Sequence, residues 1–379
     1  MITCRIISLS KYTKVFSLFV LFIIIILYQV IFASDKGKGL ELIHADKQVT
    51  KEIDGELLNI FQGNVHFRQD TLEMFCDDAI LNEQKNKLEF TGNVLITDSH
   101  SRLRAKKIDY YTKTRIAYCH DFVRIKTPKD TLYSEYLKYN FRTDEAEARL
   151  NIYIFNVENA VQIWGQEGYY DPNKKRNLIR EHARFSKVDT SSGDTLKITA
   201  DQLEYYGGED KRAVATDSVT IVQGALKAIC DSAVYHTETE IVYLFGSPYA
   251  WYEDNKLSGT FMQAQFDSLK LKDIMVSENA KAISLADSIT ERDNILTGNK
   301  IHFTIENNKP KLVMAMDNAT SIYYLQNEDK EAQGCNYATS DTILVYFAEG
   351  KLDSIAIKGG SEGIYYPEEY KGKKVFEDE

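Results

Sequence analysis

The sequence is poor in the residues that mark several large protein classes. Its 379 residues include only 5 prolines and 5 cysteines, and 46 lysines and arginines are outnumbered by 56 aspartates and glutamates. The formal net charge of -10 argues against a general nucleic-acid binder, which normally carries a basic excess. No C-x-x-C pair occurs, so a zinc site is not indicated, and a chain this long is not a small disulfide scaffold.

Sequence motifs for catalysis are also scarce. The 7 histidines show neither an H-E-x-x-H motif nor a paired spacing, and no nucleotide-binding motif is present. The stretch Gly359–Gly363 matches the G-x-S-x-G string of a nucleophile elbow, but neither a histidine nor a helical pattern follows it, so we interpret it as a turn. We therefore expect no enzyme activity, no cofactor and no metal. A glycan-processing solenoid enzyme, with carboxylates from distant repeats, is the remaining enzymatic alternative.

The N-terminus has the layout of an export signal. Arg5, Lys11 and Lys14 precede an uncharged apolar stretch over residues 15–33, and the first acidic residue is Asp35. A run of this length is compatible both with a cleaved signal peptide and with a retained membrane anchor. In either case we expect the rest of the chain to be exported, and we treat residues 1–34 as a separate segment.

The exported part repeats a short pattern with a period of about 30 residues. Each copy begins with a small residue, followed by an apolar residue three positions later and an aromatic or apolar residue two positions after that. Clear copies begin at Ala105, Ser134, Ala200, Cys230 and Gly298, and weaker ones begin at Ala45, Cys76, Gly165, Gly259 and Ser340. Because cysteine alternates here with alanine, serine and glycine, we interpret Cys76 and Cys230 as small buried residues.

A second pattern follows each start by 16 to 19 residues. It consists of a turn residue and then alternating apolar residues, as in Gly63-Asn-Val-His-Phe67 and Gly92-Asn-Val-Leu-Ile96. Within each copy the apolar residues have a period of two, which is typical of half-buried strands. Each copy is predicted to contribute two to four short strands that bury their apolar face only by stacking on neighbours.

These observations predict an all-β protein. We expect an elongated antiparallel β-jellyroll or solenoid-like array of about ten repeats, preceded by the N-terminal hydrophobic segment. Two halves are expected, over residues 41–200 and 201–365, followed by a polar charged tail over residues 366–379.

The two patterns together resemble the OstA-like (organic solvent tolerance) family, which includes periplasmic lipopolysaccharide-transport proteins. That family repeats L-x-A-D-x-L-x-Y, followed by G-x-V-x-I and a further L-x-A-D. Here Ala-Asp is intact at Ala45 and Ala200 and becomes Cys-Asp at Cys76 and Cys230, while Gly-Asn-Val is intact at Gly63 and Gly92. The resemblance covers about residues 41–365. The chain is about twice as long as a single domain of this kind.

The resemblance implies a twisted β-jellyroll, open along one edge, whose apolar groove holds acyl chains while sugars and phosphates stay in water. The alternating apolar rows supply the groove candidates, although the same spacing also describes an ordinary packed core. The candidates are Leu88, Phe90, Val94, Ile96, Leu103, Ile108, Tyr110, Leu196, Ile198, Leu203, Tyr205, Val219, Ile221 and Tyr235. The basic cluster Lys174, Lys175 and Arg176 is a candidate for phosphate contacts, or a solvated loop after Asp171-Pro172-Asn173.

The resemblance leads to a functional hypothesis. It implies an exported lipopolysaccharide-binding protein of the periplasm, either free or tethered by residues 15–33, that shields acyl chains during transport to the outer membrane. Its implied partners are lipopolysaccharide, β-jellyroll transport proteins of the inner and outer membranes, and further copies of itself joined edge to edge. The alternative is an exported structural or adhesive β-solenoid that binds a polysaccharide or a protein partner.

Overall fold

The structure is a computed structural model of the whole chain. It describes residues 39–157, 160–188, 193, 195–252, 255–267, 270–287, 292–306, 309–327, 331–348 and 351–370. The predicted signal or anchor segment, residues 1–34, lies outside these ranges. The described residues form β-strands and one short 3-10 helix, so the predicted all-β class is confirmed. Within the same ranges, no helix has the length and apolarity needed to cross a membrane.

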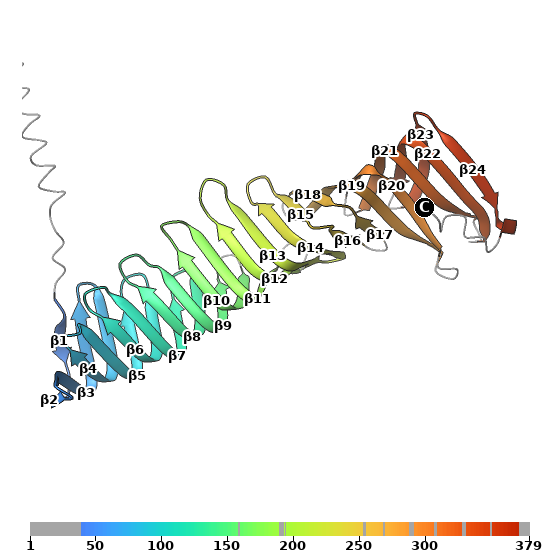
Figure 1. Cartoon of the computed structure of the whole chain (residues 1–379). Helices are drawn as coiled ribbons and strands as arrows, with labels where there is room; N and C mark the ends of the chain where they lie inside the picture. Colours follow the sequence, from blue (N-terminus) through green and yellow to red (C-terminus); the bar gives the residue numbers. More distant parts are fainter. Residues whose placement is uncertain are drawn as a thin grey trace, which may run out of the picture.

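The strands form one elongated antiparallel array in which the long strands pair with their neighbours in the sequence, while the short strands β1, β15 to β18 and β24 include pairings with strands farther along the chain (Figure 1). They are β1 (Glu41–His44), β2 (Lys47–Ile53), β3 (Glu56–Gln69), β4 (Leu72–Asn82), β5 (Lys87–Thr97), β6 (Arg102–Tyr111), β7 (Ile116–Lys126), β8 (Asp130–Asn140), β9 (Ala146–Asn156), β10 (Val161–Asp171), β11 (Arg176–Val188) and β12 (Thr195–Tyr206). They continue with β13 (Arg212–Gln223), β14 (Leu226–His236), β15 (Ile241–Phe245), β16 (Tyr249–Tyr252), β17 (Asn255–Ser258), β18 (Phe261–Asp267), β19 (Lys270–Asp287), β20 (Arg292–Glu306), β21 (Lys309–Gln326), β22 (Ala332–Ala348), β23 (Lys351–Lys358) and β24 (Glu362–Pro367). The 3-10 helix η1 (Glu368–Tyr370) follows the last strand.

Most of the long strands bend near their middle. Between β5 and β6, Thr91 pairs with Lys107 and Val94 pairs with Ala105, so two residues of β5 oppose one residue of β6. Such a β-bulge bends the strand and increases its twist. The bends lie side by side from strand to strand, and they fold the sheet lengthwise into two facing walls.

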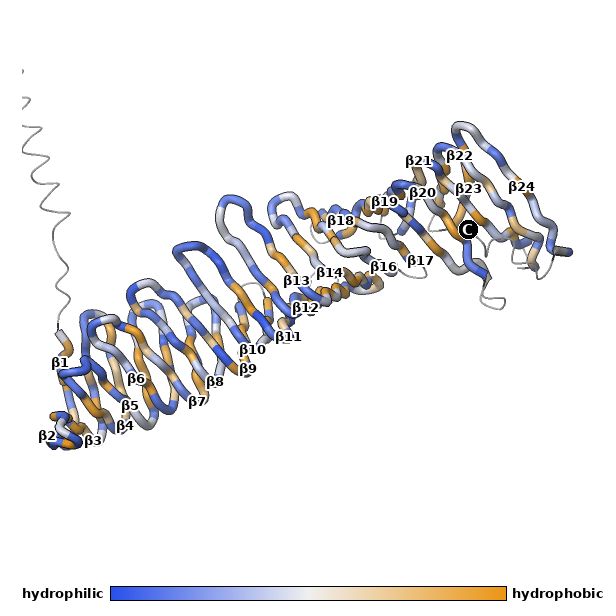
Figure 2. Tube along the Cα trace, viewed as in Figure 1, coloured by the Kyte–Doolittle hydropathy of each residue, from blue (hydrophilic) through white to orange (hydrophobic). Residues whose placement is uncertain are grey.

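We call the two halves of the folded sheet wall A and wall B. Wall A contains residues 94–97 of β5 and 102–105 of β6, and wall B contains residues 87–91 of β5 and 107–111 of β6, with the paired arms of the other strands. Apolar and polar residues alternate along these arms, as Figure 2 shows. The apolar residues of both walls point into the space between them, where Phe67 of wall A contacts Phe90 of wall B at a ring-centroid distance of 6.2 Å.

The two sequence patterns meet at the bends. The small residue that begins a copy lies at the bend of one strand, and the Gly-Asn element lies at the bend of the next strand. Asn93 Nδ2 donates a hydrogen bond of 2.9 Å to Asp77 Oδ2, and Asn64 Nδ2 donates one of the same length to Asp46 Oδ2. Gly92 has a φ of +74°, and a Cβ atom there would collide with the Asp77 carboxylate. Most copies are therefore two long bent strands, whereas the arms are separate short strands at β1 and β2, at β15 to β18, and at β23 and β24.

The buried apolar residues form two groups. One extends from Phe61 to Ala183 and the other from Ala200 to Ile343, while the sheet itself continues through β11, β12 and β13. The division of the chain into halves at residues 200 and 201 stays a prediction. Of the residues predicted as the tail, 366–370 belong to β24 and η1, where both terminal nitrogens of Arg292 donate hydrogen bonds to the Glu368 carboxylate.

The four cysteines within the described ranges are buried and form no disulfide. Burial raises the pKa of Cys76 to about 12 and that of Cys230 to about 11. Both thiols are therefore protonated and unreactive near neutral pH. This agrees with their interpretation as small buried residues at the bends.

Candidate functional site

A row of tyrosines runs along the interior face of wall B, at the margin of the space between the walls. Successive strands from β6 to β14 place a tyrosine and a smaller residue alternately in direct register. The row is Tyr110, Ala117, Tyr139, Ala146, Tyr170, Asn177, Tyr205, Ala213 and Tyr235. Tyrosines two strands apart repeat about every 10 Å, because neighbouring strands lie about 4.8 Å apart. We call this set the tyrosine row.

The tyrosine row passes from a closed interior to an open one. Tyr110 is 0% exposed and its hydroxyl donates a 2.6 Å hydrogen bond to Gln69 Oε1 on wall A, which ties the two walls together. Tyr139 is also buried, and its hydroxyl donates to Asp144 Oδ1 at 2.8 Å. By contrast, Tyr170 is 44% exposed and Tyr205 is 38% exposed. The margin of the interior is therefore shielded from water up to about β9 and accessible at Tyr170 and Tyr205 on β10 and β12, while deeper positions farther along, such as Val276 and Ile301, stay buried.

Side-chain volume accounts for this opening. The next interior row of wall B carries Ile108, Cys119 and Leu137 in the closed part. From β9 to β14 the same row carries Ala148, Gly168, Ile179, Leu203, Ala215 and Ala233, of which four are alanine or glycine. Small side chains leave space between the walls, so the facing apolar residues of wall A, such as Ile198 and Ile221, are only half-buried. We call this accessible interior, from β10 toward the C-terminal end, the trough.

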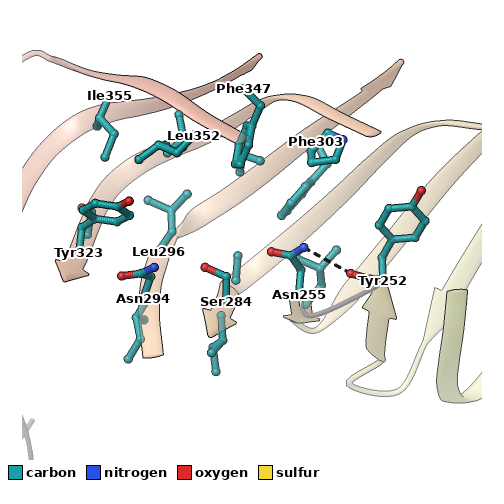
Figure 3. Close-up of a pocket in the computed structure, with 18 of the residues that line it drawn as sticks. Tyr252, Asn255, Ser284, Asn294, Leu296, Phe303, Tyr323, Phe347, Leu352 and Ile355 are labelled. Atoms are coloured by element: carbon teal, nitrogen blue, oxygen red, sulfur yellow. Dashed lines mark hydrogen bonds between the residues drawn. The ribbon is translucent and has the colours of Figure 1, made fainter. Parts of the chain in front are cut away.

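The trough contains an apolar cavity of about 170 Å³ between β17 and β23. Figure 3 shows the apolar side chains of Phe303, Phe347, Leu352 and Ile355 on one side of it, and on the opposite side the polar side chains of Asn255, Ser284 and Asn294 together with Leu296 and Tyr323. The remaining lining residues are Tyr252, Leu257, Ile274, Ala282, Ile283, Ile295, Leu296, Ile305, Pro310, Val313, Ser321, Ile322, Tyr323 and Val345.

The chemistry of this cavity is that of an amphipathic binding site. Asn255 and Ser284 are direct register partners on wall A, and Asn255 Nδ2 donates to the Tyr252 carbonyl oxygen at 3.3 Å. The polar groups thus form a line facing an apolar surface. None of the described residues that line the cavity is a carboxylate, histidine, lysine or arginine. The arrangement suits an apolar chain with neutral polar groups attached, and it provides no acid–base pair.

Some of the predicted groove residues lie in the closed part of the interior and others lie in the trough. All of them lie on the interior face or in the tyrosine row. Fully buried in the closed part are Leu88, Phe90, Val94, Ile96, Leu103, Ile108 and Tyr110, and Val219 is buried farther along. Half-buried are Leu196, Ile198, Leu203, Ile221 and Tyr235, whereas Tyr205 is exposed. None of them lines the cavity, and their contact with a ligand stays a prediction.

The predicted basic cluster lies in the turn between β10 and β11, next to Tyr170 of the tyrosine row. Lys174 Nζ lies 3.0 Å from Asp171 Oδ2, and Arg176 pairs with Glu204. Lys175 is exposed. The cluster is therefore at the margin of the trough, with two of its three charges offset by acids, and its contact with phosphate also stays a prediction.

Two further predictions concern chemistry. Gly359 and Gly360, both with positive φ, lie at the bend between β23 and β24, so the G-x-S-x-G string is a turn as predicted. Among the described residues, no group of three or more histidine, cysteine, aspartate or glutamate side chains could hold a metal ion.

Comparison with protein families identifies the first part of the array. Residues 38–184 match the family model described as OstA-like protein. The predicted resemblance is thereby confirmed, and the OstA-like region spans β1 to most of β11. It comprises the closed interior and the beginning of the trough, while the cavity lies outside it.

Solved structures with some similarity were also found, and no curated protein matches the chain. One is LptH, the LptA-homologous periplasmic component of the lipopolysaccharide transport device of Pseudomonas aeruginosa, at 13% identity and a TM-score of 0.16, over 46% of this chain and 82% of that one. Another is the WD40 domain of SCAP from fission yeast, at 8% identity and a TM-score of 0.13, over 88% of this chain and 91% of that one. TM-scores this low do not indicate a shared arrangement.

Proposed function

We propose that this protein is an exported lipopolysaccharide-binding component that shields acyl chains in its trough during transport to the outer membrane. The observation that carries the proposal is the accessible margin of the apolar interior at Tyr170 and Tyr205, together with the apolar cavity farther along, which has a line of polar side chains on one side. The OstA-like region supports the lipopolysaccharide class of ligand.

The energetics favour such a site. Each methylene removed from water contributes about 0.8 kcal/mol, so an acyl chain crosses an aqueous compartment only inside a continuous apolar surface. The cavity of about 170 Å³ is comparable to the apolar cavities of about 150 Å³ that accommodate benzene. It therefore holds part of one acyl chain, and a lipid with several chains also needs the half-buried surface along the tyrosine row.

The two ends of the array supply the proposed partner contacts. β1 and β2 pair only with β3, and β23 and β24 pair only with β22, so the outer edge of each end strand has unpaired backbone groups among the described residues. Exposed apolar residues lie on both, namely Leu42 and Ile43 on β1 and Ile364 and Tyr365 on β24. Such edges favour strand addition by another β-jellyroll or a second copy. The proposed location is the periplasm, with residues 15–33 as a cleaved signal or a tether.

Photo-crosslinking tests the proposal directly. All described strands lie between Glu41 and Pro367, so a chain that begins at Ser34 retains the whole described fold. A photoreactive phenylalanine analogue replaces Tyr205 in the open row or Phe347 in the cavity. Matched aromatic controls are Tyr139, which is buried in the same row, and Tyr243, which points outward from wall B.

Lipopolysaccharide should give adducts at Tyr205 and Phe347 but not at Tyr139 or Tyr243. Added lipid A should compete for these adducts, whereas the detached polysaccharide should not. Absence of adducts at both trough positions in the folded protein would refute lipid shielding. A second candidate function is a structural or adhesive array, which the fully buried interior of the closed part favours. Loss of the adducts on addition of the detached polysaccharide, but not of lipid A, would support this candidate.

A further inference from the structure

The outer face of wall A carries an ordered row of arginine and aromatic side chains. Six consecutive strands, β6 to β11, each place one outward-pointing residue in direct cross-strand register. The row is Arg104, Arg124, Tyr133, Tyr153, Trp164 and Arg184. With neighbouring strands about 4.8 Å apart, it extends over roughly 24 Å. We call it the arginine–aromatic row.

The three central rings of this row stack on one another. The ring centroids of Tyr133 and Tyr153 are 6.0 Å apart at an interplanar angle of 19°, and those of Tyr153 and Trp164 are 5.5 Å apart at 29°. A guanidinium group covers each end of the stack, with Arg124 Cζ 5.5 Å from the Tyr133 ring and Arg184 Cζ 5.6 Å from the Trp164 ring. The ring faces are thus occupied, and Tyr133 remains exposed to solvent.

The charges of this face are unpaired. None of Arg104, Arg124 and Arg184 forms an ion pair with any residue that the structure describes. The other outward-pointing residues of these arms are Arg102, Lys126, Thr131, Phe155, Gln162, Ser186 and Val188, without an aspartate or glutamate. The chain as a whole has a net charge of -10, so this face is positively charged although the protein is negatively charged overall.

Wall B differs on the same strands. Several of its outward-pointing cations pair with acids, as Lys138 and Arg149 do with Glu147 and as Arg176 does with Glu204. The two outer faces therefore have the same strands and spacing but different electrostatics. Wall A offers cations that are free to meet an external anionic surface.

We propose that the arginine–aromatic row docks the outer face of wall A onto an anionic lipid bilayer. Cations near a negatively charged bilayer are attracted to its lipid phosphates, and tryptophan and tyrosine favour the headgroup level because one end of each ring system is apolar and the other polar. A row of rings with arginine at both ends supplies both contributions along one line. The trough lies on the opposite face of the sheet and stays free, so this inference does not rest on the proposed function.

Vesicle flotation tests the docking surface with the chain that begins at Ser34. Binding to phosphatidylcholine vesicles that contain phosphatidylglycerol should exceed binding to phosphatidylcholine alone, and it should weaken with added salt. The variant Arg124→Gln/Arg184→Gln should bind about 25-fold more weakly, at about fivefold for each cation. The matched variant Lys138→Gln/Arg149→Gln removes the same charge from wall B and should bind like the parent chain.

Tryptophan emission gives a second measurement. The chain has only two tryptophans, so in the Trp251→Phe background the emission reports on Trp164 alone. Anionic vesicles should shift this emission to the blue, because the ring enters the headgroup region. Equal loss of binding in the two charge variants would overturn the proposal. So would binding to heparin of the same strength with no shift at Trp164 on vesicles, which would mark a general polyanion surface.

Discussion

At the scale of single residues, the bends explain why the sequence repeats as it does. Asp77 of one strand accepts a hydrogen bond from Asn93 of the next, and Gly92 leaves the space that the Asp77 carboxylate occupies. Two patterns that appear independent along the chain are the two sides of one contact. The contact recurs with different residues, as at Asp231 with Gly246 and at Asp341 with Gly359.

Substituting Gly92 with alanine tests the contact. The new Cβ would collide with Asp77, in addition to the cost of a side chain at a positive φ. Gly55 is the matched control, because it has a φ of +77° with no atom within 4 Å of the added Cβ. We expect Gly55→Ala to lower the free energy of unfolding in urea by about 1 kcal/mol and Gly92→Ala by about 2–4 kcal/mol. Equal losses would show that the carboxylate moves away without cost.

At the scale of the strand, the sequence predicts the interior face but not its openness. The period of two correctly assigns Leu88, Phe90 and Tyr205 to one face of the sheet, because alternation follows directly from strand geometry. Whether a position is closed depends on the side chains that face it from the other wall, many residues away. For this reason the spacing of apolar residues does not distinguish Tyr110, which reaches Gln69, from Tyr205, which faces water.

The residues that line the cavity are also only partly predictable from the sequence. The alternating residues Ile301, Phe303 and Ile305 are visible in the sequence as a strand, and Phe303 and Ile305 line the cavity. Nothing in that alternation predicts that Asn255, Ser284 and Asn294 lie opposite them, since these polar residues belong to three different strands. The polar side forms because Asn255, Ser284 and Asn294 are paired across neighbouring strands, although they are far apart along the chain.

Two alanines in the tyrosine row test the difference between closed and open parts. Ala117 lies between Tyr110 and Tyr139 and is 0% exposed, whereas Ala213 lies between Tyr205 and Tyr235 and is half-buried. Ala117→Leu should lower the free energy of unfolding by about 1–3 kcal/mol through overpacking. Ala213→Leu should change it by no more than about 0.5 kcal/mol, because the new side chain enters open space. A similar loss in both variants would mean that the interior is packed to the same density throughout.

At the scale of the whole molecule, the features described above lie in different parts of the array. The OstA-like region, residues 38–184, contains the closed interior and the arginine–aromatic row, while the cavity lies between β17 and β23. In an array whose elements contact only their neighbours, stability is approximately a sum of local terms, so parts can fold separately. The predicted boundary at residues 200 and 201 lies inside β12, and a cut between β11 and β12 leaves every strand intact.

Dividing the chain there gives the last prediction. The fragments 34–188 and 195–370 each retain one group of buried apolar residues almost completely. Leu203 is the one residue of the second fragment that packs against the buried group of the first fragment, among the residues that the structure describes. Both should fold, as judged by a strand-type circular dichroism spectrum and a cooperative urea transition. Lipopolysaccharide should then crosslink to Phe347 in the second fragment as in the longer chain, while anionic vesicles should bind the first fragment. An acyl chain held in the cavity alone does not need β10 and β11, so the second fragment should suffice for the crosslink. If both fragments fold and no crosslink forms at Phe347, binding requires the trough to be continuous across the division.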